Sequence, residues 1–283
     1  MNGAVDAYRR PGALALVYAA RLLAGWLVAA PIVAAINGSG LLSFPQGDAS
    51  LFAPGGDSLV ALVQTSYRFL GSAMRDSSWA FCLAAALGLL PYAFWLFALG
   101  HSGRLSLGEA AGQALQSLPR LVLLSALSLV LSGILAVLAA VTWGALYDPL
   151  VARVNERSVD LWRLASLLPF ALLWLWLSML TDLSRAAVVQ HNARFRLSLR
   201  LAWRAFKAQK LVMLSSWLTP WLWGVALIAG AALIVERIAV EQPGGWRVLL
   251  AWLLHQLVIV GLLLLRASWY TRALRGVGAQ PVE

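Results

Sequence analysis

His101 and His191 are the residues whose type and spacing come closest to a ligand-binding pair. They lie 90 positions apart, and each begins a polar stretch between two apolar runs. Two imidazoles brought together could hold a metal ion or a phosphate headgroup, but a metal site needs further ligands, which the neighbouring sequence lacks. We therefore expect both to be structural residues of the membrane interface, with a paired site as the alternative.

Arg21, His255 and the pair Asp182–Arg185 are further polar candidates, because each lies inside or at the end of an apolar run. Ionisable residues within membrane spans are functional candidates by default. Arg21 lies near the start of its run and can reach the surface, whereas His255 can hydrogen-bond a neighbouring helix. Asp182 and Arg185, spaced i, i+3, predict a local ion pair.

The segment 192–210 carries six basic residues and no acid: Arg194, Arg196, Arg200, Arg204, Lys207 and Lys210. On a helical wheel five of them form a stripe beside an apolar face that includes Phe195, Leu199 and Phe206. A basic stripe beside an apolar face is typical of a helix in a membrane interface, where Lys and Arg attract anionic lipid. The sequence predicts that these six bind lipid; the alternative is that they set topology alone.

Catalytic signatures are missing from the sequence. It contains no G-x-S-x-G, no P-loop, no H-E-x-x-H and no C-x-x-C motif, and Cys82 is its single cysteine. We therefore expect no catalytic residue, no metal site and no cofactor, and a function without catalysis.

The composition is that of an integral membrane protein. Of 283 residues, 61% are hydrophobic and 12% are charged, outside the usual range of soluble domains. The net charge of +10 does not indicate nucleic acid, because apolar runs of spanning length separate the charges. The charges predict topology and contact with anionic lipid headgroups instead.

The elements that position these residues are predicted to be helices of one transmembrane domain, residues 1–283. Six apolar runs are long enough to span a bilayer: about 13–36, 78–99, 121–146, 164–180, 211–235 and 248–265. Amphipathic interfacial helices are expected at about 58–75, 104–118 and 192–210. The expected fold is an all-α bundle of six transmembrane helices.

The distribution of basic residues predicts the orientation. With six spans and the N-terminus inside, 15 of the 22 basic residues fall on the inner side and 7 on the outer side. This asymmetry satisfies the positive-inside rule and places both termini in the cytoplasm. We expect a multi-pass protein of a bacterial cytoplasmic (inner) membrane.

An internal repeat is also predicted. Residues 101–125 align with residues 191–215 without a gap and match at seven of 25 positions, including His101 with His191. Each segment connects two spans on the inner side. We interpret spans two–three and four–five as parallel repeats; the alternative is that membrane hairpins need similar connections.

A resemblance to a group of bacterial membrane proteins lies in the same region. Arg185-Ala186-Ala187-Val188-Val189 at the end of a span, followed by Ser198-Leu199-Arg200-Leu201 and Phe206, resembles a pattern of YciC-like proteins and of the membrane domain ahead of some glycerophosphodiester phosphodiesterases. It covers about residues 75–265. The resemblance implies a multi-span architecture and carries over no catalytic residue.

The expected function follows from these observations. We expect a membrane protein without enzymatic activity that engages anionic lipid, or a membrane protein partner, through its basic cytoplasmic helices. A small transporter or channel at the repeat interface and a membrane-embedded lipid-modifying enzyme are the alternatives.

Overall fold

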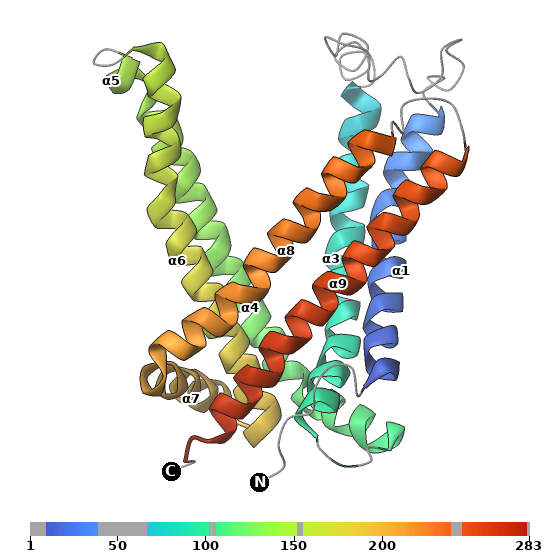
Figure 1. The fold of residues 1–283 in the computed structure, drawn as a ribbon, viewed down its shortest axis with the longest axis vertical. Helices are drawn as coiled ribbons and strands as arrows, with labels where there is room; N and C mark the ends of the chain where they lie inside the picture. Colours follow the sequence, from blue (N-terminus) through green and yellow to red (C-terminus); the bar gives the residue numbers. More distant parts are fainter. Residues whose placement is uncertain are drawn as a thin grey trace. The chain divides into compact units, whose positions relative to one another are not determined.

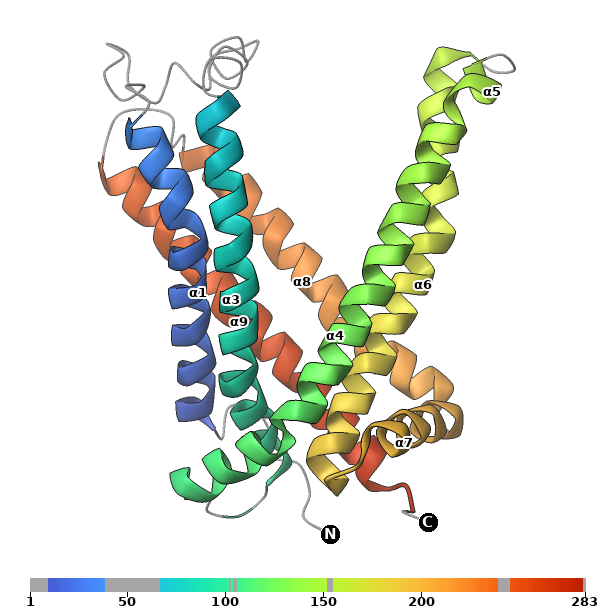
Figure 2. The same cartoon turned by 180° about the vertical axis from the view of Figure 1, so that it is seen from behind.

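The computed structural model describes residues 10–38, 67–101, 103, 106–151, 155–238 and 245–281. Every element in these ranges is an α-helix, drawn in Figures 1 and 2: α1 (Pro11–Gly38), α3 (Tyr67–Gly100), α4 (Leu107–Ala145), α5 (Tyr147–Val151), α6 (Glu156–His191), α7 (Phe195–Ala208), α8 (Lys210–Ile238) and α9 (Gly245–Gly278). Of the predicted surface helix at 58–75, residues 67–75 form the start of α3, and the remainder lies outside the described residues.

The predicted all-α membrane class and its six spans are confirmed. Within the described residues, α1, α3, α4, α6, α8 and α9 are long and apolar enough to cross a bilayer. All but α9 contain an internal proline, from Pro31 in α1 to Pro220 in α8. Spanning helices tolerate proline because neighbouring helices and side chains satisfy the freed backbone groups.

The chain divides into two compact units, each described on its own. Unit 1 includes Gly100–Trp217 and Tyr270–Glu283, and unit 2 includes Val5–Leu99 and Leu218–Trp269. Helices α8 and α9 therefore each contribute one end to unit 1 and the remainder to unit 2.

In unit 1, α4 and α6 form a long antiparallel hairpin connected through α5 (Figures 1 and 2). Partly covered residues recur every three or four positions along α4, the spacing of one helix face. Many of them are small or hydroxylated: Ser125, Ser128, Ser132, Ala139 and Thr142. Small residues let two helix backbones approach closely, so this face is the seam against α6.

Arg163 closes the α5 end of this hairpin. Its Nε donates to the carbonyl oxygen of Trp143 at 3.1 Å, and its guanidinium lies 4.1 Å from the centre of the Trp143 ring. The same side chain pairs with Asp160 at 3.5 Å and lies over Tyr147. A single α6 side chain thus holds the ends of α4 and α6 together.

The two segments of the predicted repeat are both helical but join the following span differently. Ser106 and Glu109 form a capping box that starts α4, and the helix continues through Pro119 to Ala145, with its first turns running across the remainder (Figure 2). At the aligned position of the second segment, α7 ends at Gln209, whose φ of −142° and ψ of 51° are not helical. The predicted interfacial segment 104–118 and the third span therefore share one helix, and the repeat stays a prediction.

The core of unit 1 gathers around the C-terminal part of α6. From Thr181 to Val189 every residue except Arg185 is buried, so α6 is enclosed on all sides there. Buried residues of α4, α7 and the end of α9 surround it, among them Leu121, Leu201 and Leu274. The rest of the α4–α6 hairpin exposes mostly apolar side chains, as expected of a surface in lipid.

Unit 2 packs the spanning parts of α1, α3, α8 and α9. Tyr18 of α1 donates a 2.9 Å hydrogen bond to Oε1 of Gln256 in α9. Gly224 and Gly261 let α8 and α9 approach closely, because a Cβ at either position would lie 3.1–3.2 Å from a leucine methyl group of the other helix.

Candidate functional site

Helix α7 presents three different faces. Ser198, Leu201, Ala202 and Ala205 are buried, which shows that this face packs against α6. The basic stripe lies opposite and is exposed, and aromatic and aliphatic side chains occupy the arc between the two faces. The apolar arc predicted from the sequence is therefore divided between a part that packs on protein and a part that does not.

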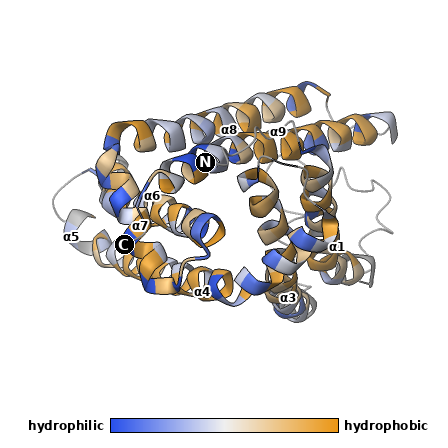
Figure 3. Ribbon diagram, turned by 90° about the horizontal axis from the view of Figure 1, so that it is seen from below, coloured by the Kyte–Doolittle hydropathy of each residue, from blue (hydrophilic) through white to orange (hydrophobic). Residues whose placement is uncertain are grey.

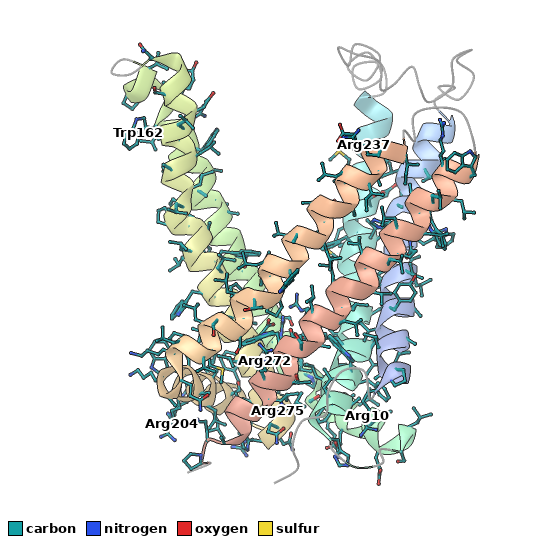
Figure 4. All side chains as sticks on the ribbon, viewed as in Figure 1. Arg10, Trp162, Arg204, Arg237, Arg272 and Arg275 are labelled. Atoms are coloured by element: carbon teal, nitrogen blue, oxygen red, sulfur yellow. The ribbon has the colours of Figure 1, made fainter. Side chains whose placement is uncertain are left out.

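The predicted lipid-binding residues are all exposed: Arg194, Arg196, Arg200, Arg204, Lys207 and Lys210. Figure 3 shows the alternation of hydrophilic and hydrophobic residues on α7. Figure 4 shows Arg204, Arg272 and Arg275 at one end of unit 1, with Trp162 at the opposite end. The end of unit 1 that contains α7 is therefore its basic end.

Trp203 lies where the intermediate face of α7 meets the basic stripe. Its ring meets Trp176 of α6 edge-on, with 6.0 Å between the ring centres, and lies 5.8 Å from the ring of Phe206. The ammonium group of Lys207 lies 5.3 Å from the same indole ring. Trp203 is still 37% exposed, so an aromatic surface remains beside the basic stripe.

A buried polar network lies in the core behind α7. Asp182 is 3% exposed and accepts hydrogen bonds from the Tyr270 hydroxyl group at 2.6 Å and from Arg185 at 3.3 Å. Arg185 also donates to the hydroxyl oxygen of Ser125 in α4 at 3.0 Å. The predicted i, i+3 ion pair of Asp182 and Arg185 is confirmed, and it links three helices.

The C-terminal end of α9 lies along the end of α6. Beyond Tyr270, the ring of His191 hydrogen-bonds the carbonyl oxygen of Val277 at 3.1 Å. A Cβ at Gly278 would lie 3.2 Å from the side-chain amide nitrogen of Gln190, and one at Gly276 would collide with the Met213 methyl group of α8. The two glycines allow this close packing.

Arg120 fastens α4 to the turn that follows α6. It donates to the backbone carbonyl oxygen of Asn192 at 2.7 Å and to the side-chain oxygen of the same residue. Asn192 ends α6 in the left-handed conformation, with φ of 48°, which asparagine adopts more readily than most residues. This turn directs the chain into α7.

The helix ends that precede His101 and His191 lie side by side. A Cβ at Gly100 would lie 3.6 Å from both Val189 and the Gln190 side-chain oxygen. The ring of His191 forms a hydrogen bond with the carbonyl oxygen of Val277, and its structural role stays a prediction. The described residues contain no group of three or more His, Cys, Asp and Glu side chains that could hold a metal ion.

Arg21 and His255 lie on two helices of unit 2 that the Tyr18–Gln256 hydrogen bond joins. Both side chains are exposed within the structure. The hydrogen bond between α1 and α9 is made by Gln256, the residue next to His255.

Three residues of the site were absent from the sequence-based candidates: Ser125, Tyr270 and Trp176. Ser125 and Tyr270 lie 60 and 88 positions from their partners, and their residue types are common in spanning helices. An interfacial tryptophan could have been expected from the 14 in the chain, but its contact with α7 could not.

Comparison with known proteins adds no assignment, since no protein-family model, curated protein or solved structure matches this chain.

Proposed function

We propose that this protein is a multi-pass protein of a bacterial inner membrane that engages anionic lipid headgroups through α7 and performs no catalysis. The observation that carries the proposal is the arrangement of α7: one face packs on α6, and the six basic side chains of the segment 194–210 stay exposed. The segment 192–210 has no acid that could neutralise them.

The electrostatic contribution is large enough to matter. A basic side chain near an anionic membrane surface contributes about 1 kcal/mol, so several on one helix hold it firmly to the surface. The exposed aromatic face adds the apolar contact that interfacial helices bury in the headgroup region. Lys and Arg snorkel, so their charges reach phosphates while their aliphatic parts stay in apolar surroundings.

The proposed orientation has the basic end of unit 1 in the cytoplasm. It is supported by the grouping of Arg204, Arg272 and Arg275 at the end opposite Trp162, and by Arg10 and Arg237 lying at opposite ends of unit 2 (Figure 4). In the positive-inside distribution, Arg10 and the three arginines belong to the inner side and Arg237 to the outer side.

Native mass spectrometry of the detergent-extracted protein with its co-purifying lipids tests the proposal. The variant Arg196→Gln/Arg200→Gln/Arg204→Gln removes three charges from α7, at a cost in lipid affinity on the order of 3 kcal/mol. We expect wild type to retain anionic lipid and this variant to lose it.

The matched control removes three charges elsewhere, with Arg75→Gln/Arg237→Gln/Arg247→Gln. It has the same net charge as the α7 variant and is expected to retain lipid like wild type. Equal lipid loss in both variants, or no anionic lipid on wild type, would overturn the proposal and direct the search to a protein partner of α7.

A further inference from the structure

Helix α6 is too long to lie wholly within a bilayer. Its 36 residues correspond to about 54 Å at 1.5 Å per residue, against about 30 Å of hydrocarbon. Even a tilt of about 40°, the upper end of the usual range, leaves it spanning about 41 Å along the membrane normal. Part of α6 must therefore project beyond the hydrocarbon.

The surface of α6 indicates which end projects. Large apolar side chains are exposed from Leu161 to Trp176, a length of about 23 Å that accounts for most of the hydrocarbon thickness. From Leu177 to His191 no residue is exposed, because α4 and α7 pack on this part of the helix and the end of α9 contacts it through Tyr270 and Val277. The apolar exterior of α6 thus ends four turns before the helix does.

Helix α7 lies at this transition. Trp203 meets α6 at Trp176, the last residue of its exposed apolar stretch. Immediately after α7, Leu211 and Val212 of α8 are 81% and 57% exposed. An apolar exterior therefore begins where α7 ends, on both neighbouring helices of unit 1.

The part of α9 in unit 1 has the opposite character. Along Tyr270–Gly278 the exposed side chains are Arg272 and Arg275, and the other residues are buried or partly covered. The start of α4 is amphipathic: Gln113 and Gln116 are exposed, and so is Leu115. These surfaces suit water or headgroups rather than hydrocarbon.

We infer that α7, the start of α4, the last four turns of α6 and the end of α9 form a layer of unit 1 outside the hydrocarbon, and that α7 is the contact of this layer with the membrane surface. The aromatic face around Trp203 enters the headgroup region, and the basic stripe meets the phosphates of anionic lipid. The buried Asp182 network then belongs to a juxtamembrane core.

This inference specifies how the proposed function is performed, and the lipid contact in it rests on that function. Charge complementarity assigns the occupant of the exposed α7 surface: six basic side chains beside an aromatic face match an anionic bilayer surface. The aromatic face also adjoins the exposed apolar residues of α6 at Trp176 and of α8 at Leu211. This favours a lipid surface as the occupant.

Site-directed labelling tests the layer. Cys82 is the single cysteine of the chain, so Cys82→Ser provides a background for single-cysteine variants in liposomes of mixed anionic and zwitterionic lipid. Gln113→Cys and Gln116→Cys report the predicted layer, whereas Ile134→Cys and Val137→Cys report the exposed middle of the same helix. A charged maleimide is applied to permeabilised liposomes and, in parallel, to protein in detergent after denaturation.

We expect Gln113→Cys and Gln116→Cys to react in liposomes at a rate within about threefold of their rate after denaturation. Ile134→Cys and Val137→Cys should react in liposomes at least about tenfold more slowly than after denaturation. On α7, a fluorophore on Leu199→Cys is expected to be quenched by nitroxide-labelled lipid more strongly than one on Arg200→Cys. Protection of the first pair to the extent of the second, or equal quenching at the two α7 positions, would overturn the inference.

The two hypotheses fail separately. If the triple Arg→Gln variant loses its lipid in mass spectrometry but Gln113→Cys is protected from the maleimide, the proposed layer is wrong and the lipid-binding function stands. If the labelling pattern is as expected but the arginine variant keeps its lipid, the layer stands without the proposed lipid contact.

Discussion

The hydroxyl group of Tyr270 donates a 2.6 Å hydrogen bond to Oδ1 of Asp182, across 88 positions of sequence and inside the core of unit 1. The same carboxylate oxygen accepts from Arg185 of its own helix. One buried oxygen therefore connects the end of α9 to α6 and, through Arg185 and Ser125, to α4. Buried charges are stable when they are paired and hydrogen-bonded, as Asp182 is here.

Tyr270→Phe is expected to destabilise the protein by about 1–3 kcal/mol, because it removes one donor from a buried carboxylate without creating a large cavity. Thermal unfolding in detergent measures the effect. Tyr147→Phe is the control, since Tyr147 is 50% exposed and its ring, which faces Arg163, is kept. Equal melting temperatures for the two variants would show that the hydrogen bond contributes no net stability.

Asp182→Leu is expected to cost about 3–5 kcal/mol, because it leaves the Arg185 guanidinium in the core without its carboxylate. The double variant Asp182→Leu/Arg185→Leu should recover a large part of that loss, since replacing both charges removes the desolvation penalty. Urea or thermal denaturation of Asp182→Leu, Arg185→Leu and the double variant gives the coupling energy between the two side chains. Additive losses would contradict a paired network.

Gly276→Ala tests the close packing of α9 on α8. A Cβ at this position would collide with the methyl group of Met213, which must move within a buried site. Because that methyl group ends a flexible side chain, the expected cost is about 1 kcal/mol, the low end for overpacking. Gly133→Ala in α4 is the control, since nothing lies within 4 Å of its Cβ. Adding Met213→Ala to Gly276→Ala should remove the extra loss in melting temperature that Gly276→Ala shows relative to Gly133→Ala. If the extra loss remains, the contact with Met213 is not its cause.

Lipid contact through α7 is expected to weaken with salt. Raising the ionic strength from 0.15 to 1 M shortens the screening length from about 8 to about 3 Å. Energy transfer from the tryptophans to a dansyl-labelled anionic lipid should therefore fall with salt in wild type and change less in the triple Arg→Gln variant. A labelled zwitterionic lipid serves as the reference, and an equal salt response for both lipids would argue against electrostatic binding.

The spans were predictable because hydropathy over 18 or more residues is a strong signal. The helix ends were not: Leu107–Ala145 and Glu156–His191 extend beyond the apolar runs at 121–146 and 164–180. The expected spans follow the apolar runs alone, and the polar segments before or after them are also helical. Tertiary packing keeps these segments helical, and composition alone does not report packing.

The basic stripe of α7 was also predictable, because charge and helical period determine it. The division of its apolar residues was not, since Leu201, which faces α6, and Leu199, which is 37% exposed, have the same side chain. Apolar surface toward protein and apolar surface toward lipid look alike in sequence. The Asp182–Arg185 pair was found because it is local, whereas Tyr270 and Ser125 required the fold.

The α4–α6 hairpin is fastened by an arginine at each end, Arg163 on the Trp143 carbonyl oxygen and Arg185 on Ser125. Both arginines belong to α6 and both acceptors to α4. A slide of one helix along the other by a single turn, about 5.4 Å, would break both bonds at once. The two arginines consequently fix the register of the hairpin, and with it the height of Arg185 relative to Ser125.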